Sequence, residues 1–162
     1  MSMRGVLAYL VSPGALSSRR AGWALTATRC TSGVVFLAFG AGKFLNHASE
    51  ASSFRTYGLP WPNLFTDAIG VLELVGGLLL AAGLATRLVA VLLAGDMVGA
   101  IVVSGLLRGE TVSLTLAPAL LMATVVLVVL GPGRVSLDAQ LLARSSRDRR
   151  RTARLAPSSG ER

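Results

Sequence analysis

The stretch GVLELVGGLLLAAGLATRLVAVLLAGDMVGA, residues 70–100, decides the fold of this chain. It is apolar almost from end to end, yet it carries Glu73, Arg87 and Asp96. A short ATR turn divides it into two apolar runs, and each run, with its neighbouring residues, is long enough to cross the hydrocarbon core of a bilayer. Because an open chain satisfies its backbone polar groups in lipid only as a helix, the stretch predicts a tight hairpin of two membrane-spanning helices.

Two further apolar segments flank this hairpin, which makes four candidate spans. They run from about Trp23 to Phe44, Leu64 to Leu84, Leu88 to Leu107 and Val112 to Leu130, with a polar loop between the first and the second. The composition agrees, because 52% of the 162 residues are hydrophobic and 15% are charged, whereas soluble domains average about 25% charged residues. We therefore predict an all-α fold, a polytopic membrane four-helix bundle.

Basic residues are distributed unevenly around these spans. With four spans both termini lie on one side, and that side would hold twelve Lys and Arg residues against three on the other. The positive-inside rule therefore predicts that both termini are cytoplasmic. The expected organisation is a cytoplasmic or interfacial leader without a signal-peptide cleavage site (residues 1–21), a membrane domain (residues 22–134) and a basic, disordered cytoplasmic tail (residues 135–162).

The net charge of +8 does not indicate a nucleic-acid partner. Seven of the 16 basic residues lie after position 140, where the chain has no aromatic residue on which a base could stack. A polybasic segment beside a membrane helix is typical of a topology determinant or of a contact with anionic lipid. We therefore expect the lipid bilayer, and no nucleic acid, as a partner.

Several redox and metal chemistries are excluded within one protomer by the presence of one cysteine, Cys30, and one histidine, His47. A single cysteine forms no internal disulfide and no CxxC dithiol. A single histidine supplies neither a multi-histidine metal site nor a bis-histidine haem. We therefore expect no metal site and no intrinsic cofactor.

The two acidic residues of the hairpin are predicted to lie at one depth. Glu73 and Asp96 are each about eleven residues from the centre of the turn, which places both roughly 16 Å from it, near the bilayer midplane. Ionisable side chains inside a membrane normally face the bundle interior and find a partner there. Arg29 is the only basic residue expected inside a span, so we expect its side chain to extend toward Glu73 or Asp96.

A secondary group of candidates consists of Lys43, Arg87 and Pro118. Lys43 closes the first span, and we expect its ammonium group to snorkel to the interface. Arg87 lies in the hairpin turn, and Pro118 should kink the fourth span because it removes one backbone hydrogen bond.

Three interpretations of the Arg29–Glu73–Asp96 set stay open, one of which is a contact with lipid or with a partner protein. At low dielectric, ionising two carboxyl groups beside a single guanidinium group costs free energy, because the two negative charges repel each other. The other two are a site that carries protons or holds a quinone headgroup, and a structural ion pair that fixes helix packing.

Three stretches together resemble the DoxX family of small bacterial membrane proteins. They are GAGKF at residues 40–44, YGLPWP at residues 57–62 followed by the hairpin stretch, and GPGRVSLD at residues 131–138. The resemblance covers roughly residues 25–140 and implies a four-helix, multi-pass protein of the bacterial cytoplasmic (inner) membrane.

The resemblance also carries functional expectations. The family includes relatives of subunits of quinone-linked thiosulfate oxidoreductases and members of membrane complexes that handle oxidative or thiol stress. The residues of this chain that fall in the matching blocks are Arg29, Lys43, Glu73, Arg87 and Asp96. One departure concerns the fourth span, where relatives often carry an acidic residue early; here TVSLTLAP offers only hydroxyl groups, and Glu110 lies in the preceding turn.

Three functions are therefore considered. The first is a redox-associated subunit that binds a quinone or anchors soluble oxidoreductase or sulfur-transfer proteins, and is at most a subunit of a quinone-linked oxidoreductase. The second is a non-enzymatic scaffold whose arginine-rich tail recruits partners or anionic lipid. The third is a small proton-coupled carrier that uses the paired acids and works as a homo-oligomer.

Overall fold

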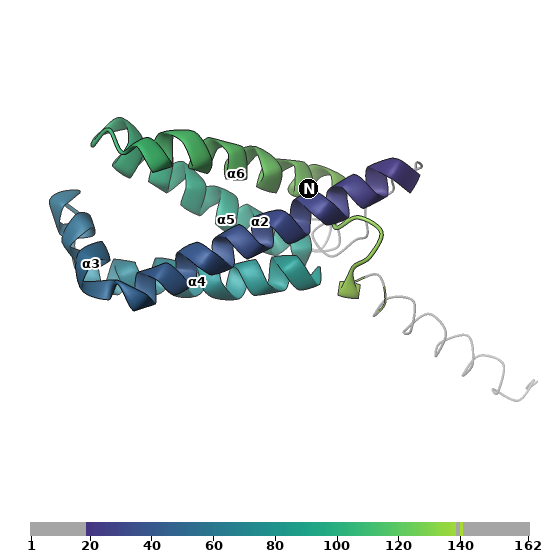
Figure 1. Ribbon diagram of the computed structural model, residues 1–162, viewed down its shortest axis with the longest axis horizontal. Helices are drawn as coiled ribbons and strands as arrows, with labels where there is room; N and C mark the ends of the chain where they lie inside the picture. The colour runs from purple at the N-terminus through teal and green to yellow at the C-terminus, as the bar shows by residue number, and fades with distance from the viewer. Residues whose placement is uncertain (1–18, 139, 141–162) are drawn as a thin grey trace, which may run out of the picture.

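The computed structural model describes residues 19–138 and residue 140. These residues form helices and no strand: α2 (Arg19–Leu45), α3 (His47–Thr56), α4 (Pro62–Ala82), α5 (Thr86–Gly99), the π-helix η1 (Ala100–Leu106) and α6 (Thr111–Leu130). Four segments of this part of the chain are long and apolar enough to cross a membrane, namely α2, α4, α5 continued by η1, and α6. The predicted all-α membrane bundle with four spans is confirmed (Figure 1).

The spans are arranged as two antiparallel pairs. α2 packs against α4, and α5 packs against α6, more extensively than any other two elements do. The pairs lie close together where α2 begins and α6 ends, and they separate toward the end where α3 lies (Figure 1). The half in which the pairs converge is called the packed half below, and the half in which they diverge is called the open half.

Glycines bring the backbones of α2 and α4 into direct contact. A Cβ atom on Gly33 of α2 would lie 2.8 Å from the carbonyl oxygen of Gly77, and one on Gly40 would lie 2.5 Å from the backbone nitrogen of Leu74. Small residues at a helix interface allow this close approach, which supplies van der Waals contact where lipid weakens the hydrophobic driving force. The α2–α4 pair is thus specified by the spacing of its glycines.

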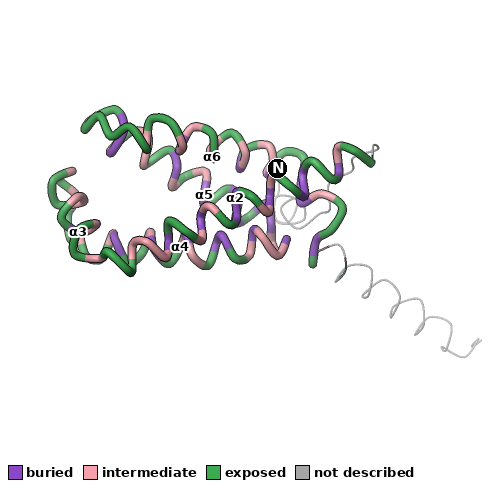
Figure 2. The backbone as a smooth tube through the Cα atoms, viewed as in Figure 1, coloured by how far each residue is buried: buried purple, intermediate pink, exposed green. Residues whose placement is uncertain are grey.

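The packed half contains most of the fully buried side chains. Leu80, Leu93, Leu127 and Thr124 have no solvent exposure, and Figure 2 shows buried segments along each of the spans. Their positions follow the inward-facing period of each helix. This layer closes the bundle between its middle and the end where α2 begins.

The segment that follows α6 folds back onto the bundle. The carboxylate of Asp138 accepts hydrogen bonds from the backbone N–H groups of Ala85 and Thr86 at 2.9 and 3.2 Å, and the backbone N–H of Asp138 donates to the carbonyl of Gly83 at 3.1 Å. These bonds satisfy backbone donors at the start of α5, as an N-terminal cap does. Residues 131–138, named the C-terminal clasp below, therefore join α6 to the α4–α5 turn.

The clasp crosses the predicted domain boundary at residue 134. The structure describes part of the residues expected in the tail (135–162), and Ser136 among them is buried. The predicted leader (residues 1–21) lies outside the described residues except for the first turn of α2, and so does the tail from residue 141 onward. The cytoplasmic orientation of both termini stays a prediction.

The connection expected to be a polar loop between the first two spans contains the helix α3. Ala51 of α3 is buried, and the ring of Phe54 packs edge-on against Tyr57 with 6.0 Å between the ring centroids. The helix is rich in serine and has few apolar residues, so local hydrophobic periodicity barely marks it. Packing on α4 stabilises it.

Candidate functional site

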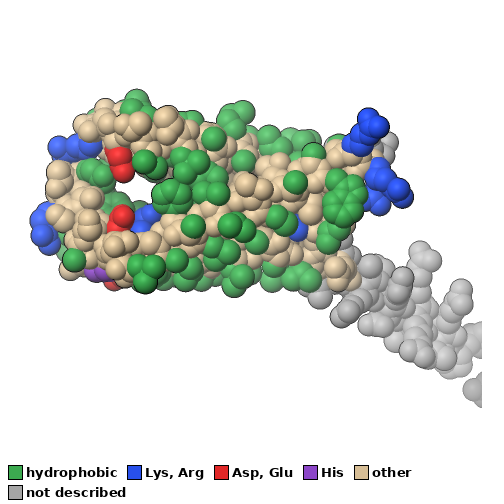
Figure 3. Space-filling model, in the orientation of Figure 1, with side chains coloured by type: hydrophobic (Ala, Val, Ile, Leu, Met, Phe, Trp, Pro, Cys, Tyr) green, Lys and Arg blue, Asp and Glu red, His purple; other side chains and the backbone are tan. Residues whose placement is uncertain are grey.

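A cavity of about 500 Å³ lies between the two helix pairs in the open half of the bundle. Figure 3 shows the opening at the end where α3 lies, with acidic and basic side chains at its edge. Four of the five phenylalanines of the chain line it: Phe36, Phe39, Phe54 and Phe65. Its volume falls within the range of small-molecule sites, about 300–1,000 Å³.

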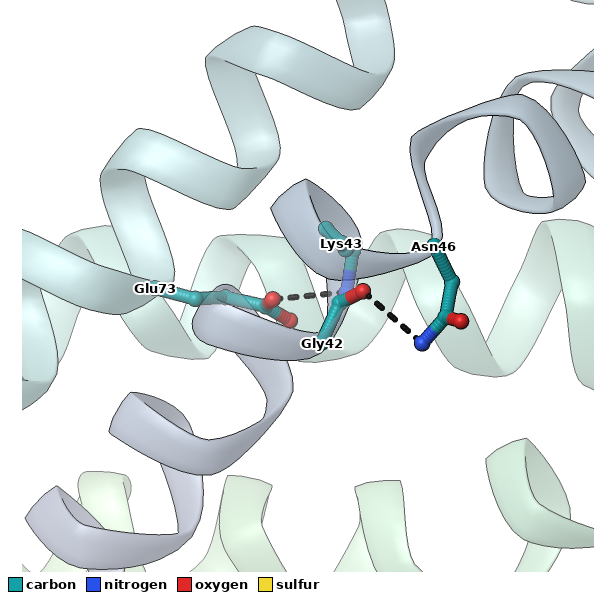
Figure 4. Close-up of polar contacts among 4 residues, drawn as sticks. All are labelled: Gly42, Lys43, Asn46 and Glu73. Atoms are coloured by element: carbon teal, nitrogen blue, oxygen red, sulfur yellow. Dashed lines mark hydrogen bonds and ion pairs between the residues drawn. The ribbon is translucent and has the colours of Figure 1, made fainter.

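The polar centre of this cavity is an ion pair between Lys43 and Glu73. The Lys43 Nζ atom lies 2.6 Å from Glu73 Oε2, and the two side chains are 12% and 4% exposed (Figure 4). The ammonium group also lies 6.0 Å from the centroid of the Phe39 ring. An ion pair this enclosed restricts both side chains to one geometry.

The expectation that Lys43 snorkels to the interface is wrong. α2 extends to Leu45 and runs antiparallel to α4, which brings the last turn of α2 beside the middle of α4. Gly70 of α4 leaves room for this approach, since a Cβ atom there would lie 3.2 Å from the Phe44 ring and 3.4 Å from the Lys43 Cβ atom. The Lys43 side chain consequently turns inward and meets Glu73.

Asp96 of α5 lines the same cavity as Glu73. Its Oδ2 atom is buried and has no hydrogen-bond partner among the described residues. Asp96 is close enough to Lys43 and Glu73 to interact electrostatically with both. The predicted meeting of the two hairpin acids is therefore observed, and the base that joins them is Lys43.

Arg29 is not part of this cluster, and the predicted Arg29–Glu73–Asp96 contact is wrong. Arg29 and Lys43 are 14 residues apart on α2, or about 21 Å along the helix axis, beyond the reach of an arginine side chain. The buried Arg29 guanidinium instead donates to the backbone carbonyls of Pro132 and Val135 at 3.2 and 2.6 Å. Its role is to hold the C-terminal clasp on α2.

The other two secondary candidates also lie outside the cavity lining. Arg87 is buried near the clasp end, where its guanidinium donates to the Val129 carbonyl at 3.5 Å. Pro118 lies within α6, which continues on both sides of it. Its neighbours Ala117 and Leu116 contribute to the cavity wall, whereas Pro118 does not.

The mouth of the cavity contains polar residues that the sequence did not single out. Tyr57 donates to Glu110 Oε2 at 3.4 Å, and Ser113 donates to the same oxygen at 2.8 Å. Burial, and then the nearby Glu110 carboxylate, raise the pKa of Tyr57. Glu50 of α3 completes this group. The sequence offers a signal for this meeting, because the connection after the first span and the RGE turn after the third span must lie at the same end of a four-span bundle.

Two other titratable residues near this end, His47 and Asp67, form a separate surface contact. His47 Nε2 lies 3.0 Å from Asp67 Oδ1, and both side chains are substantially exposed. No group of three or more His, Cys, Asp and Glu side chains with metal-binding geometry occurs in the described part of the chain. The cavity is therefore characterised by one ammonium group, four carboxylates and aromatic walls.

Comparison with known proteins places these features in context. The DoxX family model matches residues 24–106, which include Lys43, Glu73 and Asp96. "Putative oxidoreductase CatD" of Bacillus subtilis is 38% identical over 74 residues, covering 46% of this chain and 54% of the relative. "Uncharacterized membrane protein Rv3486" of Mycobacterium tuberculosis is 45% identical over 71 residues, covering 43% and 44%.

The chain thus spans about half the length of the curated relatives it matches. No solved structure matches it.

Proposed function

This chain belongs to the DoxX family of membrane proteins, and on that premise we propose that it is the membrane subunit of an oxidoreductase complex that binds a quinone headgroup in the cavity. The observation that carries the proposal is the Lys43–Glu73 pair with Asp96 inside an aromatic-walled cavity. The name of the Bacillus subtilis relative supports the redox part. We further propose that the membrane is the bacterial cytoplasmic one and that both termini face the cytoplasm.

The chemistry of the cavity suits such a ligand. A quinone headgroup is a flat ring with two carbonyl oxygens, which accept hydrogen bonds and take up protons when the ring is reduced. The Lys43 ammonium can donate to one carbonyl, and the Glu73 and Asp96 carboxyl groups can exchange protons beside it. Phenylalanine side chains offer apolar faces against which the ring can stack.

Access to the cavity is consistent with a lipophilic ligand. The opening lies on the long side of the bundle, between the two helix pairs (Figure 3). With the four spans crossing the bilayer, the part of the opening between the helix pairs would face lipid, and the part at the α3 end would face the membrane surface. A quinone could therefore enter laterally from the membrane without crossing water.

Electrons would come from a soluble partner in this proposal. With one cysteine and one histidine in the sequence, the chain itself has no dithiol or multi-histidine redox centre. A soluble oxidoreductase or sulfur-transfer protein bound at the membrane surface would supply them. The scaffold alternative relies on the arginine-rich tail, which lies outside the described residues, and the carrier alternative stays a prediction.

Equilibrium binding of a short-chain quinone to the full chain in lipid nanodiscs tests the proposal. Asp96→Asn and Lys43→Met should each weaken binding about tenfold to a hundredfold, because a charge-assisted hydrogen bond contributes about 1.5–3 kcal/mol. Asp67→Asn is the matched control, since this carboxylate lies outside the cavity. Absence of quinone binding by the unmodified chain, or equal binding by all variants, would refute the proposed site.

A further inference from the structure

The cavity is lined by groups that can exchange protons, whereas the packed half of the bundle is filled by buried side chains. The cavity lining extends from the Glu73–Asp96 pair to Glu50, Tyr57 and Glu110 at the α3 end. Toward the other end the interior is occupied by side chains without solvent exposure, including Leu80, Leu93 and Leu127. The cavity thus connects the carboxyl pair to the polar groups at the α3 end, whereas packed side chains lie toward the other end.

The closed end is held by specific bonds as well as by packing. Arg29 binds the clasp carbonyls at 3.2 and 2.6 Å, and Asp138 caps α5 at 2.9 and 3.2 Å. A Cβ atom on Gly133 of the clasp would lie 2.8 Å from the Gly22 carbonyl oxygen, so the clasp lies directly on α2. These contacts keep the helix pairs together at that end.

The open end contains a chain of groups that can accept or donate protons. Glu50 of α3 is close enough to Glu73 to interact with it electrostatically. Tyr57 and Ser113 both donate to Glu110, so one oxygen links the α3 connection to the start of α6. Ser104 of η1 lines the same cavity, and its backbone carbonyl accepts a hydrogen bond from the backbone N–H of Glu110 at 3.0 Å.

The charges around the carboxyl pair can be assigned element by element. α2 contributes Lys43, α3 contributes Glu50, and the turns beyond contribute Tyr57 and Glu110. The cavity-lining residues of η1 and α6 are apolar or carry hydroxyl groups. Four carboxylates therefore face one ammonium group, an excess of negative charge that a low-dielectric cavity can hold only if protons or water enter it.

We propose that the Glu73–Asp96 pair exchanges protons with one side of the membrane only, the side on which α3 lies, through a mouth formed by Glu50, Tyr57 and Glu110. This deepens the proposed function, on which it rests for its purpose: protons taken up or released by the quinone would be exchanged on the α3 side. Reduction of the ring would take two electrons from the soluble donor and two protons from that side. The accessibility itself does not depend on a quinone.

Single cysteines at matched serine positions test the access route. In a Cys30→Ser background, Ser104→Cys reports on the cavity wall and Ser32→Cys on the packed half, where Ser32 of α2 is buried. Each full-length variant is reconstituted in vesicles of known orientation and treated with a membrane-impermeant methanethiosulfonate reagent on either side. We expect Ser104→Cys to react at least about tenfold faster from the α3 side, and Ser32→Cys to react from neither side.

A pH gradient across the same vesicles supplies the proton readout. Because the thiolate is the reactive species, the rate of the Ser104→Cys variant should follow the pH of the α3-side compartment and ignore the other. Glu110→Gln should lower the preference for a cationic over an anionic reagent, since it removes a negative charge from the mouth. A rate that follows the opposite compartment, or no reaction from the α3 side, would overturn the inference.

The two proposals can fail separately. One-sided labelling in a chain that binds no quinone would leave the access route standing and remove its redox purpose. Quinone binding combined with labelling from the side of the termini would keep the function and refute the route. The control Ser32→Cys guards against misfolding, because a disrupted bundle would expose it to the reagent.

Discussion

Removing the Lys43 charge should destabilise the bundle through Glu73. In the native structure the Lys43 ammonium lies 2.6 Å from Glu73 Oε2, and the Glu73 side chain is 4% exposed. The Lys43→Met variant keeps a flexible apolar stem of similar length but leaves the Glu73 carboxylate without its nearest cation. The carboxylate must then remain charged in a poorly solvated site or bind a proton, and either outcome costs free energy.

The expected loss of unfolding free energy in Lys43→Met follows from how deeply the ion pair is buried. Loss of one partner from a buried ion pair costs about 3–5 kcal/mol. The Lys43 side chain is 12% exposed and the pair borders a cavity, so we expect the lower end, about 3 kcal/mol. The double variant Lys43→Met/Glu73→Gln removes both charges and should cost less than Lys43→Met alone, with a coupling energy of about 2 kcal/mol.

Reversible unfolding in mixed detergent–lipid micelles, followed by circular dichroism, measures these free energies. Arg55→Met is the control, since Arg55 is an exposed cation of α3 at the same end of the molecule. It should change the free energy of unfolding by no more than about 0.5 kcal/mol. If Lys43→Met cost no more than Arg55→Met, or if the double variant were additive, the ion pair would not be the polar centre of the cavity.

Other predictions follow from the helix contacts and the mouth. Gly40→Ala should lower the free energy of unfolding by about 1–3 kcal/mol, because its Cβ atom would lie 2.5 Å from the α4 backbone. Gly95→Ala should be neutral or stabilising, because the space around Gly95 is open. Chemical unfolding compares the two variants. Asp138→Ala should cost about 0.5–2 kcal/mol in the same assay by uncapping α5, and a cost no larger than for Gly95→Ala would contradict the clasp. Ultraviolet titration, with the other tyrosine replaced by phenylalanine, should find the Tyr57 pKa above its ordinary value of 10.0 because of burial and then Glu110. Glu110→Gln should lower that pKa, and an unchanged pKa would contradict the contact.

Predictions that rest on distance along the chain were accurate. Hydropathy marked the four spans, because each helix that crosses a bilayer needs its own run of apolar residues. The equal depth of Glu73 and Asp96 could be counted from the turn between them, because residues in one tight hairpin are related by helical rise alone. The cavity confirms this meeting, since both carboxylates line it.

Predictions that depended on how distant helices rotate and pair were wrong for Arg29 and Lys43 and missed α3. The choice between Arg29 and Lys43 as the partner of Glu73 depended on where α2 ends and on the side by which it meets α4. The glycines that set this contact act only when both helices are present. α3 was missed because its few apolar residues are stabilised by α4 and not by a pattern of their own.

The sequence by itself determined the membrane class, the number of spans and the meeting of the two hairpin acids, because hydropathy and helical rise are local properties of the chain. Only the tertiary structure decided that Lys43 meets Glu73, that Arg29 binds the clasp, and that one half of the bundle is hollow. Each of these depends on contacts between residues far apart in the chain, and such contacts form only after whole helices have packed.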